Sequence, residues 1–254
     1  MRSDHGGVQS VERAFRLLEL LADTHGGSSL NELSAIVGLP VTTCHRLLKT
    51  LASLGYVRQL PSRRYGLGLG MTRLSRHADL QLGVLARPYL ERIVAETGET
   101  ANMALLDGDR VAYVAQAPSP HAMRMFTEVG HRAFTHSTGV GKAILSMLDG
   151  ASVRRIVTRA GMPRATAATI VEFDVLEREL ELIRERGYAL DDGEQELGVR
   201  CYAVPLIGLP VPVAISVSGP GVRLTEDMGP KVVPQLKAAA TALARELAGD
   251  MGTA

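Results

Sequence analysis

Two short helix-forming segments joined by Gly38-Leu39-Pro40 constrain the fold of this chain more than any other feature. The first segment, residues 30–37, follows Ser29, and Glu32 lies three residues later, which is the pattern of an N-terminal capping box. The second segment, residues 41–54, ends before a glycine, a residue common at helix C-termini. Two short helices with a tight turn between them predict a helix-turn-helix, a motif that binds DNA.

Another amphipathic helix is predicted before this pair, over residues 8–23, because its apolar residues recur at helical spacing. We expect the apolar faces of this helix and of the helix over 41–54 to form one core. The expected buried residues are Val11, Ala14, Phe15, Leu18 and Leu21 in the former and Cys44, Leu47, Leu48, Leu51 and Leu54 in the latter.

The opposite face of the second helix of the motif is polar, and a helix of this kind fits the major groove of DNA. Arg46 is expected to pair with guanine and Lys49 to contact phosphate. Thr42 and Thr43 stand at the helix start, where hydroxyl and backbone N–H groups hold phosphate or bases. His45 lies on the same face. Each of these residues is also compatible with an ordinary solvated surface, and Thr42 with a capping role.

A β-hairpin, or wing, is predicted next, from short strands at Tyr56–Gln59 and Tyr65–Leu67 around a Pro-Ser-Arg-Arg turn. Arg63 and Arg64 at its tip are expected to enter the minor groove or to contact the DNA backbone. Residues 1–70 hold 8 Lys/Arg and 5 Asp/Glu, a net charge of +3, whereas the rest of the chain carries −2. A basic N-terminal part agrees with DNA binding.

The remainder of the chain predicts a linker followed by an α+β domain. Helical patterns over 71–80 and 82–97 suggest a connector, and Asp107-Gly108-Asp109 is a strong hairpin signal. The expected strands are Asn102–Leu106, Val111–Gln116, Met123–Glu128, Tyr188–Leu190, Cys201–Ile207 and Val213–Ser218, and the expected helices are 139–148, 172–186 and 225–248. Antiparallel strands interleaved with helices favour an α+β sensor-like fold. The predicted domains are therefore 1–70, 71–97 and 98–254.

Several residues of this second part are of the kind that binds a small anion. Glycines near Gly139, at a predicted helix start, let backbone N–H groups approach a carboxylate. Ser216 and Ser218 are two apart on a strand and face the same side, and Asp191 and Cys201 come from neighbouring segments. The alternatives stay open, because strand serines, closely packed glycines and buried free cysteines are also common structural residues.

The motifs of both parts resemble those of IclR-type bacterial regulators. In the N-terminal part they are Val8–Ala14, Gly38–Leu48 and Gly55-Tyr56-Val57, and in the second part Asp191–Glu194, Gly198–Cys201 and Ile215–Pro220. The resemblance covers the whole chain. It implies a winged helix-turn-helix, a linker helix and an effector-binding domain of GAF-like topology, assembled as a homodimer or homotetramer on double-stranded operator DNA.

One branch of that family, the glyoxylate-responsive repressors of the allantoin pathway, resembles the chain in further segments: Asn102–Asp107, Met123–Met125, His136–Ala143 and Leu197–Cys201. Its ligand-contacting positions correspond to Gly139, Val140, Asp191, Cys201, Ser216 and Ser218. Val140 stands where that branch has alanine, which preserves a backbone N–H contact but reduces pocket volume. The resemblance implies a repressor released by glyoxylate, allantoin, allantoate or a related acid, with an activator or a sensor of another small carboxylate as alternatives.

The motifs do not favour an enzyme. Gly139-Val140-Gly141-Lys142 falls short of a phosphate-binding loop, because His136 and Ala143 stand where that motif requires glycine and Ser or Thr. His131 and His136 are five residues apart and have no third ligand nearby, so neither zinc nor another cofactor is expected. An enzyme acting on a small oxo-acid through Cys201 is kept as the weaker alternative.

The sequence also predicts a cytoplasmic location. The longest apolar run, Val204–Val217, is too short to span a membrane and is broken by prolines. The N-terminal residues contain no apolar signal core. Cys44 and Cys201 are therefore expected to be free thiols in a reducing compartment.

Overall fold

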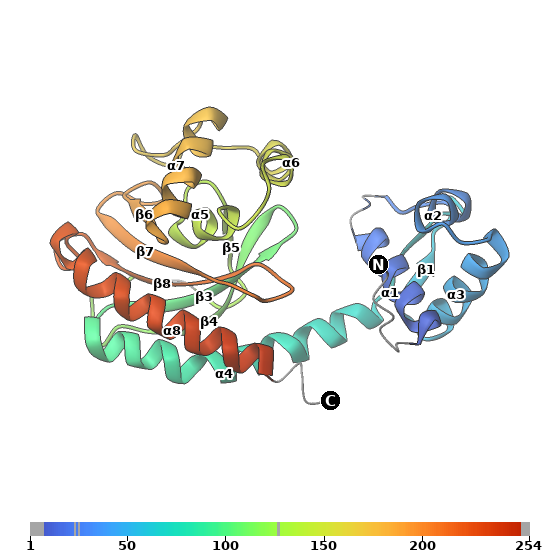
Figure 1. Cartoon of the computed structure of the whole chain (residues 1–254), viewed down its shortest axis with the longest axis horizontal. Coiled ribbons are helices and arrows are strands. Elements are labelled where there is room, and N and C mark those ends of the chain that lie inside the picture. The colour runs from blue at the N-terminus through green and yellow to red at the C-terminus, as the bar shows by residue number, and fades with distance from the viewer. Residues whose placement is uncertain (1–7, 23, 25, 126–127, 250–254) are drawn as a thin grey trace. The chain divides into compact units, whose positions relative to one another are not determined.

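The computed structural model describes residues 8–22, 24, 26–125 and 128–249 (Figure 1). The chain divides into two compact units, Met1–Ala78 and Asp79–Ala254. The boundary falls inside α4 (Gly70–Thr97), one helix that contains Pro88. The two helical patterns expected between residues 71 and 97 are therefore parts of a single helix.

The first unit contains the elements of a winged helix-turn-helix in the predicted order: α1 (Gln9–Ala22), α2 (Leu30–Val37), α3 (Val41–Ser53), β1 (Val57–Gln59) and β2 (Tyr65–Leu67). The capping box forms as predicted, with the Ser29 side chain accepting from the Glu32 N–H and the Glu32 carboxylate from the Ser29 N–H. Gly38 ends α2 in the left-handed conformation, at φ 68°, which glycine adopts without steric cost. The strands β1 and β2 pair antiparallel, which confirms the wing.

The core of this unit differs from the prediction at the start of α1 and the end of α3. Its buried residues are Leu17, Leu18, Leu21, Leu33, Val37, Cys44, Leu48, Leu51, Val57 and Tyr65. Val11 and Phe15, expected to be buried, are 52% and 59% exposed, because the leucines in the second half of α1 make the contacts with this core. Leu54 is 61% exposed, since α3 ends at Ser53 and Leu54 is its C-cap, outside the buried stripe of the helix.

The second unit contains a six-stranded antiparallel sheet in the order β5-β4-β3-β8-β7-β6. Its strands are β3 (Thr100–Asp107), β4 (Arg110–Ala117), β5 (Arg132–Phe134), β6 (Ala189–Asp192), β7 (Val199–Leu206) and β8 (Val213–Pro220). The β3–β4 hairpin turns after Asp107, as predicted. The strand expected at 123–128 is absent from residues 123–125 and 128, while 126–127 lie outside the described residues. The strand of this region is β5 instead, because it pairs with β4 from residue 132 onward.

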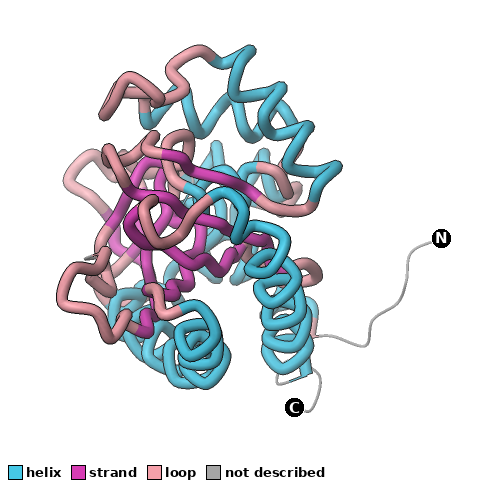
Figure 2. The backbone as a smooth tube through the Cα atoms, turned by 90° about the vertical axis from the view of Figure 1, so that its left-hand side faces the viewer, coloured by secondary structure: helices cyan, strands magenta, loops and turns pink. Residues whose placement is uncertain are grey.

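Helices cover both faces of the sheet, and Figure 2 shows the strands as a layer between them. One face packs against α4 and α8 (Gly229–Gly249), which follows a short 3-10 helix, Glu226–Met228. The other face carries α5 (Gly139–Leu145), α6 (Gly150–Ala160) and α7 (Phe173–Arg186). Strand alternation divides β7 accordingly: Tyr202 and Val204 face α8, whereas Cys201 and Ala203 face α5. The predicted α+β class is confirmed, although α6 was not predicted.

Candidate DNA-binding and effector sites

The polar face of α3 is free of contacts with the core of its unit. Thr42, His45, Arg46 and Lys49 are exposed, and Thr43 is half-buried. The N-cap of α3 is Pro40, which makes no side-chain hydrogen bond, so Thr42 is not the capping residue of this helix. The structure therefore presents the five predicted side chains from one helix, with Cys44, Leu48 and Leu51 on its buried side.

The two arginines of the wing differ from each other. Arg63 is exposed and has φ 60°, the left-handed conformation at the tip of the hairpin. Arg64 turns back onto α2: its Nη2 lies 2.8 Å from Glu32 Oε2, and its Nε donates to Gly27 O at 2.9 Å. Arg58 on β1 is a further exposed cation that the sequence analysis did not single out.

The start of α5 lies close to the sheet because its residues are small. Thr138 caps the helix by accepting from the Gly141 N–H at 3.1 Å, and it donates to Phe134 O. Gly139 and Val140 follow and are buried. A Cβ added at Gly139 would lie 2.8 Å from Cys201 Sγ, so only glycine allows α5 to pack this near β7.

The four predicted side chains of the sheet lie on the face that α5 covers. Asp191 pairs in register with Cys201, and Cys201 with Ser218, while Ser216 pairs with Ala203. Because side chains alternate along a strand, the register places all four on one side. The structure thus brings together all six predicted effector residues, from α5, β6, β7 and β8.

Buried polar atoms without a hydrogen-bond partner gather in the same region. Among the described residues these atoms are Thr135 Oγ1, His136 Nδ1, Glu194 Oε2 and Ser216 Oγ, with Gln235 Oε1 on α8 as the exception. Ser216 is 1% exposed, and its hydroxyl acts on the neighbouring Cys201 thiol, whose sulfur is only a weak acceptor. Unpaired buried polar atoms are rare in folded proteins and point to a site for ligand or water.

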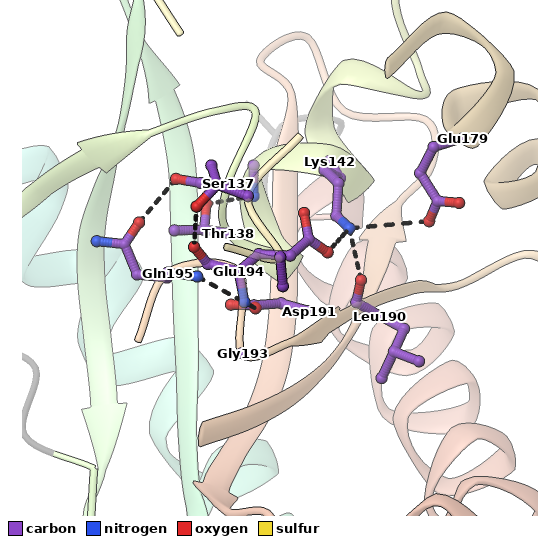
Figure 3. Close-up of polar contacts among 12 residues, drawn as sticks. Ser137, Thr138, Lys142, Glu179, Leu190, Asp191, Gly193, Glu194 and Gln195 are labelled. Atoms are coloured by element: carbon purple, nitrogen blue, oxygen red, sulfur yellow. Dashed lines mark hydrogen bonds and ion pairs between the residues drawn. The ribbon is translucent and has the colours of Figure 1, made fainter. Parts of the chain in front are cut away.

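A loop after β6 contributes polar contacts that sequence reasoning missed (Figure 3). Asp191 Oδ1 accepts from the backbone N–H groups of Glu194 at 2.8 Å and of Gln195 at 3.4 Å. Ser137, just before α5, donates to Gln195 Oε1 at 2.7 Å. These bonds hold the loop against the start of α5 and fix the Asp191 carboxylate.

Lys142 of α5 is a buried cation next to these residues (Figure 3). Its Nζ donates to Leu190 O at 2.6 Å, forms an ion pair with Glu194, and lies 3.8 Å from Glu179 Oε1. From the sequence, Lys142 belongs to the predicted helix start and to a motif that falls short of a phosphate-binding loop, and neither pattern predicts a buried ion pair. Its acceptors come from residues about 40 to 50 positions further along the chain, so no local spacing indicated them.

Burial sets the protonation of the site. It raises the pKa of Asp191 to about 6, although the Glu194 N–H and Lys142 oppose the rise. Burial and then the Asp191 charge raise the pKa of the Cys201 thiol to about 12, while the hydroxyls of Ser218 and Ser216 act in the opposite direction. Burial lowers the pKa of His136, whose Nε2 lies 3.1 Å from Pro163 O. A neutral thiol is a poor nucleophile, which argues against chemistry at Cys201.

The polar face of the sheet continues past Ser216 onto β3 and β4. Ser216 pairs in register with Asn102, whose Oδ1 accepts from Gln116 Nε2 at 3.0 Å. Thr100, two residues earlier on β3, is fully buried and accepts from the Ser119 N–H. The alternation of Thr100, Asn102 and Ala104 within an otherwise apolar strand was the available signal for this extension.

A separate cavity of about 650 Å³ lies between α7, α8 and the end of β7. Its lining includes Met147, Ile183, Lys237, Ala240 and Arg245, and none of the predicted effector residues. Within the described part of the chain, no group of three or more His, Cys, Asp or Glu side chains is placed to hold a metal ion. Nor does any described helix have the length and apolar character needed to cross a membrane.

Comparison with known proteins identifies the family. Residues 10–61 match the IclR helix-turn-helix domain, and residues 76–245, more than half of the chain, match the C-terminal part of IclR bacterial transcriptional regulators. The chain belongs to the IclR family. It is thus a DNA-binding regulator of transcription, and the IclR proteins that it matches are regulators rather than enzymes.

Curated IclR relatives align over most of their length. The chain is 37% identical to the transcriptional repressor IclR of Escherichia coli K12, over 87% of this chain and 84% of that protein. It is 33% identical to the HTH-type transcriptional repressor AllR of the same strain, over 98% and 90% of the two chains. The IclR structure from Thermotoga maritima superposes with a TM-score of 0.63 at 28% identity, covering 94% of this chain and 98% of that one. These identities do not single out one branch of the IclR family.

Proposed function

We propose that this chain is a repressor that binds operator DNA and is released by a small monocarboxylic acid. The observation that carries the proposal is the convergence of Gly139, Val140, Asp191, Cys201, Ser216 and Ser218 beneath the start of α5, where the buried Ser216 hydroxyl has no partner among the described residues. A two-carbon oxo-acid such as glyoxylate fits a site of hydroxyl, thiol and backbone N–H donors. The chain's relatives IclR and AllR are named repressors, which supports repression rather than activation as the proposed role.

For the DNA side we propose that α3 reads bases through Thr42, Thr43, His45, Arg46 and Lys49. Arg63 is our candidate for the wing contact, since it is exposed at the tip. Arg64 contacts Glu32 and Gly27 instead, which supports a role in fixing the wing. A homodimer would place two α3 helices in successive major grooves, about 10 base pairs apart. A protein with this task works in the cytoplasm, where the chromosome is.

The link between the two sites is proposed to be α4, which begins in the first unit and ends in the second. An effector releases DNA only if it binds one arrangement of the protein more tightly than another. The allantoin pathway is our candidate for the regulated genes, because of the segments that resemble that branch. Allantoin and allantoate are therefore tested beside glyoxylate.

The decisive experiment is a gel-shift titration of the full chain on operator DNA selected from a random library. Glyoxylate, allantoin or allantoate is expected to weaken DNA binding at millimolar concentration. The Ser216→Ala, Ser218→Ala double variant is expected to bind DNA normally and to ignore the acid. If no acid changes DNA affinity, the effector assignment fails and the DNA-binding assignment stands.

The same selection tests the reading face of α3. We expect Arg46→Ala to relax preference at one base pair, costing about 1–3 kcal/mol at that position, because a bidentate guanine contact is lost. Lys49→Ala serves as the matched control: loss of a phosphate contact weakens all sequences alike and reduces the salt dependence. An unchanged base preference in Arg46→Ala would place Arg46 on phosphate or solvent.

A further inference from the structure

The effector site contains buried carboxylates but no cation available to a ligand. The one buried ammonium among the described residues is that of Lys142, which is 1% exposed. An ammonium has three N–H donors, and three acceptors surround this one: Leu190 O at 2.6 Å, Glu194 Oε1, and Glu179 Oε1 at 3.8 Å (Figure 3). A bound acid therefore cannot rely on Lys142 to neutralise its charge.

Asp191 keeps one carboxylate oxygen free for a ligand. Both backbone N–H groups that reach Asp191, from Glu194 and Gln195, donate to Oδ1. The other oxygen, Oδ2, accepts no hydrogen bond from the described residues, although the side chain is only 4% exposed. A ligand that contacts Asp191 therefore does so at Oδ2, the carboxylate oxygen to which no described residue already donates.

The groups that face Asp191 do not compensate a second negative charge. They are Lys142 on α5, Asp192 on the same strand, Glu194 and Gln195 on the following loop, Cys201 on β7, and Tyr113 on β4. Lys142 is the only cation among them, and it is already paired with Glu194. An ionised acid beside an ionised Asp191 would place two like charges together in a buried site, and such pairs are known to share a proton.

We propose that Asp191 takes up one proton when the effector binds, and that the site thereby selects acids with one negative charge over acids with two. The inference rests on the proposed function, in which the effector binds beside Asp191. The proton comes from solvent and sits on Oδ2, from where it is donated to the ionised carboxylate of the effector. The buried charge is then the same before and after binding.

Acids with two negative charges are disfavoured, because the buried charge would then differ before and after binding. A dicarboxylate or a phosphate dianion would bring an additional negative charge that one proton on Asp191 does not offset. The remaining donors, the Cys201 thiol and the hydroxyls of Ser216 and Ser218, are neutral. Asp191 is thus a specificity-determining residue through its protonation as well as its position.

The direction in which glyoxylate affinity changes with pH follows from the pKa of Asp191 in the ligand-free protein. Burial raises the pKa of Asp191 to about 6, and a bound anion raises it further. Below about pH 6 the group is already protonated and affinity is flat. Above that pH, binding requires proton uptake, and the affinity for glyoxylate falls about tenfold per pH unit until the pKa of the complex is reached.

The test is calorimetric titration of the full chain with glyoxylate between pH 6 and 8.5, in two buffers of different ionisation enthalpy. We expect about one proton taken up per glyoxylate at pH 8. Oxalate, which carries two charges, is expected to bind at least ten times more weakly. Asp191→Asn keeps an acceptor for the two backbone N–H groups and offers an N–H₂ donor in place of the protonated oxygen, so we expect it to bind glyoxylate without proton uptake or pH dependence.

Asp192→Asn is the matched control, because it alters the neighbouring carboxylate on the same strand and leaves Asp191 and the Lys142–Glu194 ion pair unchanged. It is expected to retain proton uptake, and circular dichroism with operator binding reports whether both variants fold. Any one of four results would overturn the inference alone. They are wild-type binding without proton uptake, uptake retained in Asp191→Asn, uptake lost in folded Asp192→Asn, and equal affinity for oxalate and glyoxylate. If none of glyoxylate, allantoin and allantoate binds at any pH, the proposed effector class fails and the inference fails with it.

Discussion

At the residue scale, the proposed effector site is marked by buried polar groups that have no hydrogen-bond partner among the described residues. The hydroxyl of Ser216 is buried among strands and has no hydrogen-bond partner of good geometry among the described residues. An unpaired buried hydroxyl costs about 1–3 kcal/mol of stability. The unpaired hydroxyl is explained if a ligand supplies its hydrogen-bond partner. The stability lost in the ligand-free protein is then regained when the ligand binds.

Ser216→Ala is therefore expected to raise the free energy of unfolding, by about 1 kcal/mol, while abolishing the response to effector. Denaturant titration and the gel shift measure the two effects. Ser119 provides the matched control, because it is equally buried but its hydroxyl donates to Gly98 O at 2.6 Å and accepts from the His121 N–H. Ser119→Ala should destabilise the chain. A loss of stability in Ser216→Ala would mean that Ser216 is structural.

At the scale of elements, the sequence patterns that fix local backbone geometry gave correct predictions. The capping box at Ser29, the turn at Gly38 and the hairpin at Gly108 fix backbone geometry within a few residues, and each formed as predicted. Strand alternation likewise placed Ser216 and Ser218 on one face. The face of α1 was predicted less well, because its first turns carry apolar residues that the core of this unit does not cover.

Contacts between segments far apart in the sequence could not be predicted from such local patterns. Lys142 meets Glu194, and Ser137 meets Gln195, across more than 50 residues. Which partner each finds depends on the order of strands in the sheet, and no spacing along the chain encodes that order. The short strand β5 was missed for a related reason, since three residues carry too little alternation and its pairing with β4 defines it.

The wing offers a test at this scale, because its tip combines backbone strain with exposure. Arg63 has φ 60°, a conformation that costs a residue with a side chain about 1–2 kcal/mol. Arg63→Gly should relieve that cost, less the entropy that glycine adds to the unfolded chain, and raise the free energy of unfolding by about 0.5–1 kcal/mol. If Arg63 contacts DNA, the same variant binds operator more weakly. Greater stability with unchanged DNA affinity would leave the wing without a contact at Arg63.

At the scale of the whole molecule, the surface of α1 bears on assembly. Val11 and Phe15 on α1 are 52% and 59% exposed, and Val8, just before the helix, is 67% exposed. Clustered apolar side chains on a surface favour association, and a second copy of the chain is the partner that operator binding by paired half-sites requires. We therefore expect α1 to contribute to the proposed homodimer.

Phe15→Glu is expected to shift the full chain toward monomer and to weaken operator binding, because one α3 helix alone contacts only one half-site. Sedimentation velocity measures the first effect and the gel shift the second. Val222→Asp is the control, since Val222 is 84% exposed and lies in the other unit. Effector affinity should stay unchanged in Phe15→Glu, because the residues of the proposed site all belong to the second unit. A Phe15→Glu protein that remains dimeric and binds operator normally would exclude α1 from the interface, and the dimer contact would then have to lie elsewhere.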